Sequence, residues 1–327
     1  MRRGILVPRR DVFLSINLSI SLARNRGEAM HSDAVWFGMR SWPGRHECLC
    51  RGFLCAAVLC PLSAHVDFGT NDGTSLLSVY AQQVDRRLNI PESEKRAYAE
   101  LLVENLAAVD CNEAQYVLIV DRNKFVQAAM IYWMSPDRIF HFIGASPVST
   151  GKPGRFDHFV TPTGVFEHTI DNLDFLSQGT RNEFGIRGYG RKGMRVYDFG
   201  WQTAQRGWGG GGEGEMRLQM HATDPNLLEK KLGTPQSKGC IRIPATLNAF
   251  IDHYGILDND YERAMAEGMT FWVLPKTRKA TPWSGRFLVV VDTGRTRRPT
   301  WSLPSRKRSG GDSPSEIYQR YPSSRVR

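Results

Sequence analysis

The chain has 327 residues, of which 41% are hydrophobic and 23% charged, a composition typical of a folded globular protein with a buried core. Its net charge of +10 would suit nucleic-acid binding, but residues 1–64 carry 9 Lys/Arg against 4 Asp/Glu, residues 276–327 carry 13 against 3, and the middle carries 21 against 26. A slightly acidic body with basic ends argues against a nucleic-acid groove, so we expect no nucleic-acid partner.

The first 64 residues have the pattern of an export signal. From Met39 the chain carries three arginines, then an apolar run over residues 52–62, and then a small residue at Ala64. This is the order of regions in a secretory signal peptide. The run is shorter than the roughly 20 residues that span a bilayer, so we expect no membrane span in the mature chain. Residues 1–64 are therefore interpreted as an upstream extension and a signal peptide, which places the protein in the periplasm or cell envelope.

Two of the six cysteines, Cys111 and Cys240, remain after the predicted signal. In an exported protein they could join in one disulfide. Metal binding is less well supported, because no CxxC, HExxH or His/Cys cluster at ligand spacing accompanies either thiol. No metal or cofactor is expected, while a disulfide and a nucleophilic role for Cys240 both remain open at this stage.

Residues 65–114 have the spacing of two short helices. Apolar side chains recur at helical intervals in two stripes, Leu76, Tyr80, Val84 and Leu88 in the first and Tyr98, Leu101, Leu102 and Leu106 in the second. Pro91 and the acidic residues after it are typical of the first turn of a helix. We predict a helical hairpin whose apolar side chains serve packing rather than chemistry.

From residue 115 the pattern changes to strands. Apolar runs at 116–121, 125–134 and 138–146, separated by short polar turns, predict an antiparallel meander. Further candidate strands lie at 195–202, 216–222, 269–275 and 286–292. One helix interrupts them; it is expected to begin at Ile243 or Pro244 and to stop at Gly255. The predicted fold is mostly β, a sheet or sandwich with one inserted helix, over residues 115–276. Residues 277–327 are expected to form a basic, disordered tail.

Cys240 lies in the segment PQSKGCIRIP, just before the predicted helix. The positive helix end, with Arg242 or Lys238 nearby, would lower the thiol pKa from about 8.5 into the range of roughly 3.5–7.5 and so favour a nucleophilic thiolate. The amides of Gly239 and Cys240 are candidate oxyanion donors, because glycine leaves room for a ligand. A nucleophilic cysteine also needs a base, and His221, at the end of a predicted strand, is the candidate.

The segment MHATDPNLLEKKLGTPQSKGCIRIP resembles the catalytic signature of the L,D-transpeptidase family, in which a histidine and a spacer precede [S/T]-x-G-C-x-R. The matching residues are His221, Ser237, Gly239, Cys240 and Arg242. The upstream stretch at 145–166 is similar to the Ser-Thr-Gly-Lys and Thr-Pro-x-Gly segments of that family. The resemblance covers residues 115–276.

This resemblance implies an L,D-transpeptidase-like β-sandwich that remodels peptidoglycan and so contributes to cell-wall organisation and cell shape. Cys240 would form a thioester with a stem tetrapeptide, release D-alanine and pass the acyl group to an amine, with His221 as the base. The remaining positions would assist: Gly239, Ser237, Arg242 and Ala222 at the oxyanion and the loop, and Lys238 and Thr223 in contact with substrate. The carbonyl of Ala222 or of a neighbouring residue would orient the imidazole.

Two positions depart from the family pattern. Lys238 stands where the family usually has histidine, and Ala222 follows His221 in place of the usual glycine or serine. A lysine is charged near neutral pH and cannot accept a proton there without a large pKa shift. Two alternatives stay open, an L,D-carboxypeptidase-type hydrolase that uses water and a non-catalytic scaffold that binds the cell wall. The expected partners are peptidoglycan stem peptides, and the chain is expected to be a monomer.

Overall fold

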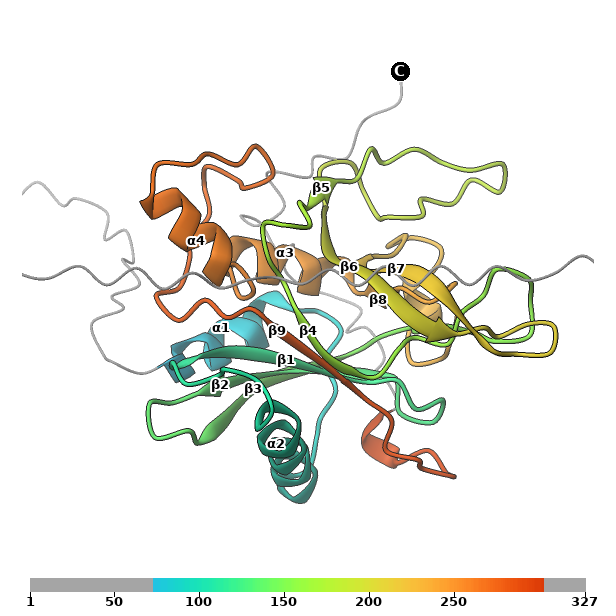
Figure 1. The fold of residues 1–327 in the computed structure, drawn as a ribbon, viewed down its shortest axis with the longest axis horizontal. Helices are drawn as coiled ribbons and strands as arrows, with labels where there is room; N and C mark the ends of the chain where they lie inside the picture. The colour runs from blue at the N-terminus through green and yellow to red at the C-terminus, as the bar shows by residue number, and fades with distance from the viewer. Residues whose placement is uncertain (1–72, 303–327) are drawn as a thin grey trace, which may run out of the picture. The chain divides into compact units, whose positions relative to one another are not determined.

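Two β-sheets dominate residues 73–302, which are the residues that the computed structural model describes (Figure 1). Sheet A has the strand order β3-β2-β1-β9-β4 and sheet B the order β5-β6-β7-β8. The strands of sheet A are β1 (Gln115–Asp121), β2 (Ala128–Met134), β3 (Phe140–Pro147), β4 (Gly164–Glu167) and β9 (Phe287–Val291). Those of sheet B are β5 (Phe175–Leu176), β6 (Arg195–Gln205), β7 (Glu213–Ala222) and β8 (Ile241–Ile243). The structure is mixed α/β with two sheets and few helices, which is consistent with the mostly-β prediction.

The predicted meander is confirmed, because β1 pairs antiparallel with β2 and β2 antiparallel with β3. The predicted domain boundary at residue 276 is wrong. Strand β9 lies beyond that boundary, yet it fills the middle of sheet A, parallel to β1 and antiparallel to β4. All five of its side chains are buried. Residues 277–302 therefore belong to the folded body rather than to a tail.

Two predictions about elements near the C-terminal end also need correction. The run at 269–275 is not a strand but a series of turns, and Trp272 within it is largely exposed. The helix after Cys240, α3 (Ala245–Tyr254), begins one residue after Pro244 and ends at Gly255 with a left-handed φ of 59°, as expected. A second helix, α4 (Asn259–Ala266), follows it and was not anticipated.

Helices α1 (Leu76–Gln83) and α2 (Glu92–Leu106) form where predicted, but they are not a hairpin. Tyr80 of α1 packs in the same core cluster as Leu118 of β1, whereas Leu102 of α2 packs in the cluster that contains Val117. Successive side chains of a strand point to opposite faces, so the two helices cover opposite faces of sheet A (Figure 1). Three short 3₁₀ turns complete the described elements: Gly73–Ser75, Glu229–Lys231 and Thr300–Ser302.

The larger core lies between the two sheets. It joins Leu118 of sheet A to Leu218, Met220 and Ile241 of sheet B, with Phe250 of α3 against them. Full burial of each such side chain contributes about 1.5–3 kcal/mol. Because Leu218 and Met220 face this core, the alternate side chains of β7 must face the other way. That outer face of sheet B carries the candidate site.

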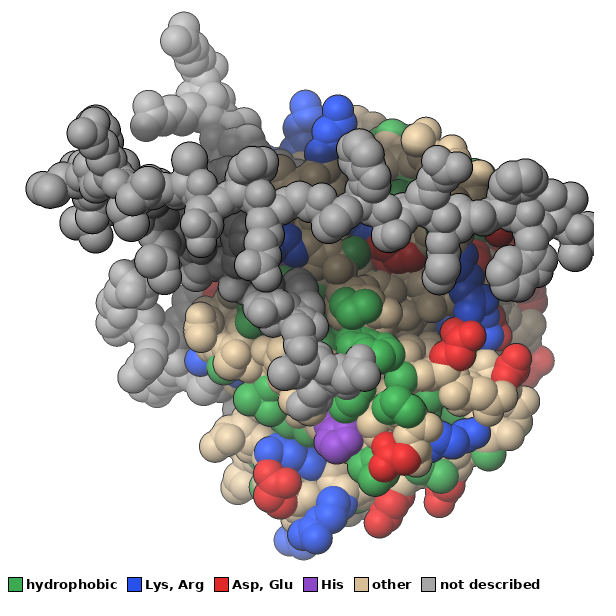
Figure 2. Space-filling model, turned by 90° about the vertical axis from the view of Figure 1, so that its left-hand side faces the viewer, with side chains coloured by type: hydrophobic (Ala, Val, Ile, Leu, Met, Phe, Trp, Pro, Cys, Tyr) green, Lys and Arg blue, Asp and Glu red, His purple; other side chains and the backbone are tan. Residues whose placement is uncertain are grey.

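The face shown in Figure 2 carries both positive and negative side chains and is not uniformly basic. Apolar side chains gather near the middle of that face, with Lys, Arg, Asp and Glu interspersed around them. No helix between residues 73 and 302 combines the length and the apolar character needed to cross a membrane. The predicted signal peptide (1–64) and the end of the predicted tail (303–327) lie outside the described residues.

Candidate active site

The register of sheet B puts Cys240 and His221 on the same face. Strands β7 and β8 are parallel, with Met220 paired to Ile241 and His221 paired to Arg242. Met220 and Ile241 point into the core. Side-chain alternation therefore directs His221, Arg242 and Cys240 to the outer face, with Cys240 diagonally adjacent to His221. The outward-facing polar side chains of β7 therefore lie beside those of β8.

His221 is buried, and its ring is fixed by one hydrogen bond. Nδ1 lies 2.8 Å from the Ala222 carbonyl oxygen. A carbonyl can only accept, so Nδ1 carries the proton and Nε2 keeps a free lone pair. Burial lowers the pKa of His221 from 6.5 to about 4; the Ala222 carbonyl opposes this shift and the charge of Arg242 adds to it. The imidazole is therefore neutral at pH 7 and able to accept a proton at Nε2.

The environment of Cys240 differs from the expectation for a helix-activated thiol. Strand β8 and Pro244 separate Cys240 from the first residue of α3, so the helix end is not at the sulfur. Burial raises the pKa of the Cys240 thiol, although the amide of Gln219 and the charge of Arg242 partly oppose this. The prediction of a lowered pKa is thus wrong in direction, because burial outweighs the nearby positive charge. Cys240 and His221 are a neutral thiol and a neutral imidazole at pH 7.

A tight turn at residues 237–240 presents the thiol. The buried Ser237 Oγ donates to the Cys240 carbonyl at 2.5 Å and accepts the Gly239 amide at 3.0 Å. Gly239 has φ +137°, and an added Cβ would lie 2.6 Å from Met216 Sδ, so glycine is required here. Since the Gly239 amide is already engaged, it is not the oxyanion donor that the sequence suggested. The amides of Gln219 and Cys240 favour the thiolate and so lower the thiol pKa, and the thiol itself donates to the Arg217 carbonyl oxygen at 3.9 Å.

The upstream segment that resembles Ser-Thr-Gly-Lys lies directly against this turn. Ser149 and Arg242 exchange backbone hydrogen bonds of 2.9 Å in both directions. Thr150 accepts the Ser237 amide at 3.0 Å, and the Thr161 hydroxyl donates to the Gly239 carbonyl at 2.6 Å. Two segments about 80 residues apart in sequence, both singled out by the resemblance, are therefore joined by backbone contacts around Cys240.

Four residues that sequence reasoning missed complete the outer face. Tyr189 lies over His221, with 4.6 Å between ring centroids, and its hydroxyl donates to Gln219 Oε1 at 3.2 Å. Gln219 and Arg217 both donate to Asp198 Oδ2, at 2.9 and 2.7 Å. Alternation in MRLQMH could have revealed Arg217 and Gln219. No local signal marks Tyr189 or Asp198, which come from other parts of the chain.

The remaining predicted site residues point in different directions. Lys238 is exposed, and its Nζ pairs with Asp157 Oδ2 at 2.8 Å on the surface. Arg242 donates from Nη1 to the Gln236 carbonyl at 3.3 Å. Thr223 is buried, and its amide donates to the Ile243 carbonyl at 3.2 Å. Thr223 and Arg242 line a cavity beside the site, whereas Lys238 does not.

The disulfide that the sequence left open as an alternative does not form, since both Cys111 and Cys240 are free. Cys111 is fully buried in the core under α2, with its sulfur 4.0 Å from Met134 Sδ. Burial raises its pKa to about 11, so it is an inert packing residue at neutral pH. Within residues 73–302 no group of three or more His, Cys, Asp or Glu is arranged to hold a metal ion.

Comparison with known proteins gives no independent assignment. No protein-family model matches the chain. No curated protein is significantly similar to it.

Proposed function

We propose that the chain is a cysteine acyltransferase of the L,D-transpeptidase type that acts on peptidoglycan stem peptides after export to the cell envelope. The observation that carries the proposal is the His221 ring. Its Nδ1 is held by the Ala222 carbonyl, its Nε2 is free to accept a proton, and it shares the outer face of sheet B with Cys240. The contacts between the two segments that carry the family resemblance support it further.

The acylation step follows from the protonation states. His221 Nε2 removes the thiol proton of Cys240 as the sulfur attacks the carbonyl carbon before the terminal D-alanine. The carbonyl oxygen gains the negative charge, and the Cys240 amide is the candidate donor to it, a contact worth about 3–4 kcal/mol. When the intermediate collapses, the C–N bond breaks and the imidazolium gives its proton to the departing D-alanine amine. Because thiol and imidazole are both neutral beforehand, His221 acts as a general base rather than as half of an ion pair.

In the second step an acceptor breaks the thioester, and His221 transfers a proton from the acceptor to the sulfur. An amine of a second stem peptide attacks the thioester carbon, His221 takes the amine proton, and the proton returns to the Cys240 sulfur as it leaves. Water in place of the amine would give the hydrolytic reaction. Lys238, at the surface in its pair with Asp157, would contact an anionic part of the substrate by giving up that pair.

Acylation by a carbapenem tests the proposal. The full chain is incubated with the carbapenem, and peptide mapping by mass spectrometry locates any adduct. We expect one adduct, on Cys240, that is lost in Cys240→Ala and formed at least about tenfold more slowly in His221→Gln. Cys111→Ala is the matched control, since it removes a thiol outside the site and should retain the adduct.

The outcomes separate the alternatives. No adduct on Cys240 in a folded chain would contradict an acyltransferase and favour the cell-wall-binding scaffold. If the adduct forms, incubation with a purified stem tetrapeptide distinguishes transfer from hydrolysis. A crosslinked dimer supports transfer, and a tripeptide without dimer supports hydrolysis.

A further inference from the structure

An exposed aromatic cluster, formed by Phe156, Phe159 and Trp208, lies on two loops close to the turn at residues 237–240. Phe156, in the loop between β3 and β4, is 82% exposed, the largest value among the large apolar side chains of residues 73–302. Trp208, in the loop between β6 and β7, contacts it with 5.7 Å between ring centroids, and Phe159 contacts Trp208 at 4.8 Å. Contiguous apolar side chains at a surface mark a site of interaction, whereas a single exposed ring does not.

Backbone contacts hold the two loops together. The Gly154 amide donates to the Gly207 carbonyl at 2.6 Å, and the Gly207 amide donates to the His158 carbonyl at 2.8 Å. A Cβ at Gly207 would lie 2.4 Å from that His158 oxygen, so only glycine permits this approach. Figure 1 shows the loop after β3 beside the β6–β7 hairpin at the right of the molecule. The aromatic cluster is therefore presented by two loops that act as one support.

The two loops also carry an excess of positive charge. Three of their cations are exposed and make no ion pair within residues 73–302: Lys152, Arg155 and Arg206. The one carboxylate of residues 152–159, Asp157, is already paired with Lys238 at 2.8 Å. Glu213 is the next carboxylate along the hairpin, and it lies beyond the glycines at 209–212. Unpaired cations next to exposed rings are complementary to an anionic apolar surface.

The hairpin tip offers little for a folded protein partner to recognise. Residues 209–212 are all glycine, and a Cβ at any of these four positions would meet no atom within 4 Å. Phe156 has no polar atom, so it gains only by leaving water. A protein interface surrounds such a ring with paired polar groups, whereas a lipid layer needs only rings at its boundary and cations at its phosphates. The tip therefore suits a membrane surface better than a protein.

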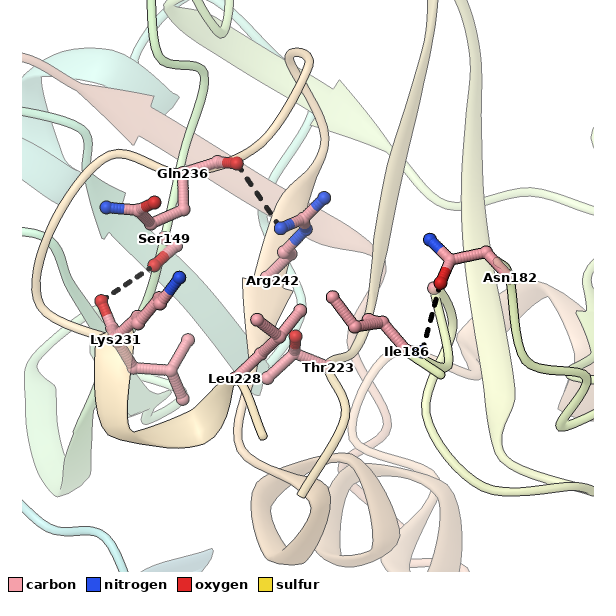
Figure 3. Close-up of a pocket in the computed structure, with 10 residues that line it drawn as sticks. Ser149, Asn182, Ile186, Thr223, Leu228, Lys231, Gln236 and Arg242 are labelled. Carbon is pink, nitrogen blue, oxygen red and sulfur yellow. Dashed lines mark hydrogen bonds between the residues drawn. The ribbon is translucent and has the colours of Figure 1, made fainter. Parts of the chain in front are cut away.

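We propose that the aromatic cluster docks the protein on an anionic phospholipid surface. Phe156 and Trp208 enter the boundary between headgroups and acyl chains, while the three cations stay at the phosphates on their long apolar stems. The proposal does not depend on the proposed function. The docking residues are also distinct from those of the cavity beside the candidate site, which Ser149, Gln236 and Arg242 line (Figure 3).

Docking would hold the candidate site close to the headgroups. The Phe159 amide donates to the Lys238 carbonyl at 2.9 Å. The Cβ of Phe159 lies 3.3 Å from where a Cβ on Gly239 would be, and Cys240 is the next residue. The aromatic cluster and the thiol are thus carried by segments in direct contact. A docked molecule would present Cys240 to substrates that lie at the face of the bilayer.

Sedimentation with vesicles tests the proposal. The full chain is mixed with vesicles of phosphatidylcholine alone, or of phosphatidylcholine and phosphatidylglycerol, and the bound fraction gives a partition coefficient. We expect the coefficient to be at least about tenfold higher with the anionic vesicles and to fall as salt screens the charges. Equal partition onto both kinds of vesicle would overturn the proposal.

Matched variants assign the binding to the two loops. On anionic vesicles, Phe156→Ser should lower the partition coefficient about tenfold, because it removes the apolar side chain that leaves water. Arg155→Glu should lower it at least about fivefold there and leave the neutral vesicles unchanged. Two controls, Phe184→Ser and Arg181→Glu, make the same changes at exposed positions outside these loops and should have no effect. Losses in the controls as large as those in the loop variants would contradict the assignment.

Hydrogen exchange locates the contact independently of the rest of the chain and of the carbapenem reaction. Backbone exchange is measured with and without anionic vesicles. We expect vesicles to slow exchange in peptides that cover residues 152–160 and 205–213, and to have no such effect in Phe156→Ser. Unchanged exchange in these peptides would overturn the proposal. Binding to purified peptidoglycan that falls in Phe156→Ser, while partition onto vesicles does not, would also overturn it and assign the cluster to a polysaccharide.

Discussion

The protonation state of two side chains, His221 and Cys240, decides how the site would react. Burial lowers the pKa of His221 to about 4 and raises that of the Cys240 thiol. As the pH rises through 4, His221 loses its proton and becomes a base; above that it stays neutral. The thiol keeps its proton well beyond neutral pH. The pair therefore stays a protonated thiol and a neutral imidazole, the state that the proposed general-base step requires, from about pH 6 to 8.

This predicts a specific pH profile. Carbapenem acylation of Cys240 should rise with a midpoint near pH 4 and then remain level between about pH 6 and 8. Alkylation of the same residue by iodoacetamide, which needs the thiolate, should instead increase only above the ordinary cysteine pKa of about 8.5. Both are measured on the peptide that contains Cys240. Rapid alkylation near pH 6 would mean a preformed thiolate–imidazolium pair and would contradict the general-base step.

At the level of residues, sequence patterns predict which residues form the candidate site better than they predict the surroundings of those residues. The positions of Cys240 and His221 follow from the motif, and the structure brings them to one face. Their pKa values do not follow, because they depend on how much of the chain covers the site. Tyr189 over His221 and Asp198 beside Gln219 are contributed by β6 and the loop before it, and no local spacing indicates them.

At the level of elements, a buried charge cluster connects sheet B to the two C-terminal helices. Arg195 of β6 is fully buried and pairs with Asp174 at 2.5 Å, with Asp258 before α4 at 2.8 Å and with Asp252 of α3 at 3.4 Å. His168 donates to the same Asp174 at 2.9 Å. Burial lowers its pKa, but the charge and hydrogen bond of Asp174, together with the charge of Asp258, outweigh that effect, and the pKa of His168 is raised. The cluster fixes α3, and with it the end of β8, against the sheet.

Removing the central cation of this cluster should be costly. Arg195→Met would leave carboxylates buried without their main partner, and we expect the free energy of unfolding to fall by about 3–5 kcal/mol. Arg263→Met is the control, because its pair with Glu113 is exposed and should contribute less than about 1 kcal/mol. Urea denaturation of both variants measures the difference. Equal effects of the two substitutions would show that the buried cluster does not stabilise the fold.

The elements that were predicted correctly are those whose signal is local. Strands β1 to β3 are apolar runs bounded by turn residues, and α3 has helical spacing and a glycine stop. The run at 269–275 has a similar composition but finds no neighbouring strand among residues 73–302, so it folds into turns with Val273 buried and Trp272 exposed. A strand needs a partner for its backbone groups, and composition alone does not supply one.

At the level of the whole chain, the main error of sequence reasoning was the end of the folded body. Strand β9 pairs in parallel with β1, about 170 residues earlier, and lies between β1 and β4. Such a pairing cannot be read from local periodicity. The candidate strand at 286–292 is confirmed as β9, Phe287–Val291, but the basic composition after residue 276 led to a domain boundary that excluded it.

This placement predicts opposite outcomes for two truncations. A chain that ends at Lys276 loses β9, which removes five buried apolar side chains worth on the order of 10 kcal/mol and leaves one edge of β1 unpaired. Since domains are typically stable by only 5–15 kcal/mol, this chain should not fold. A chain that ends at Ser302 keeps both sheets and should retain cooperative thermal unfolding by circular dichroism and the carbapenem adduct on Cys240. Cooperative unfolding with an adduct in the chain ending at Lys276 would show instead that β9 is dispensable and that the folded body ends at residue 276, as its composition first suggested.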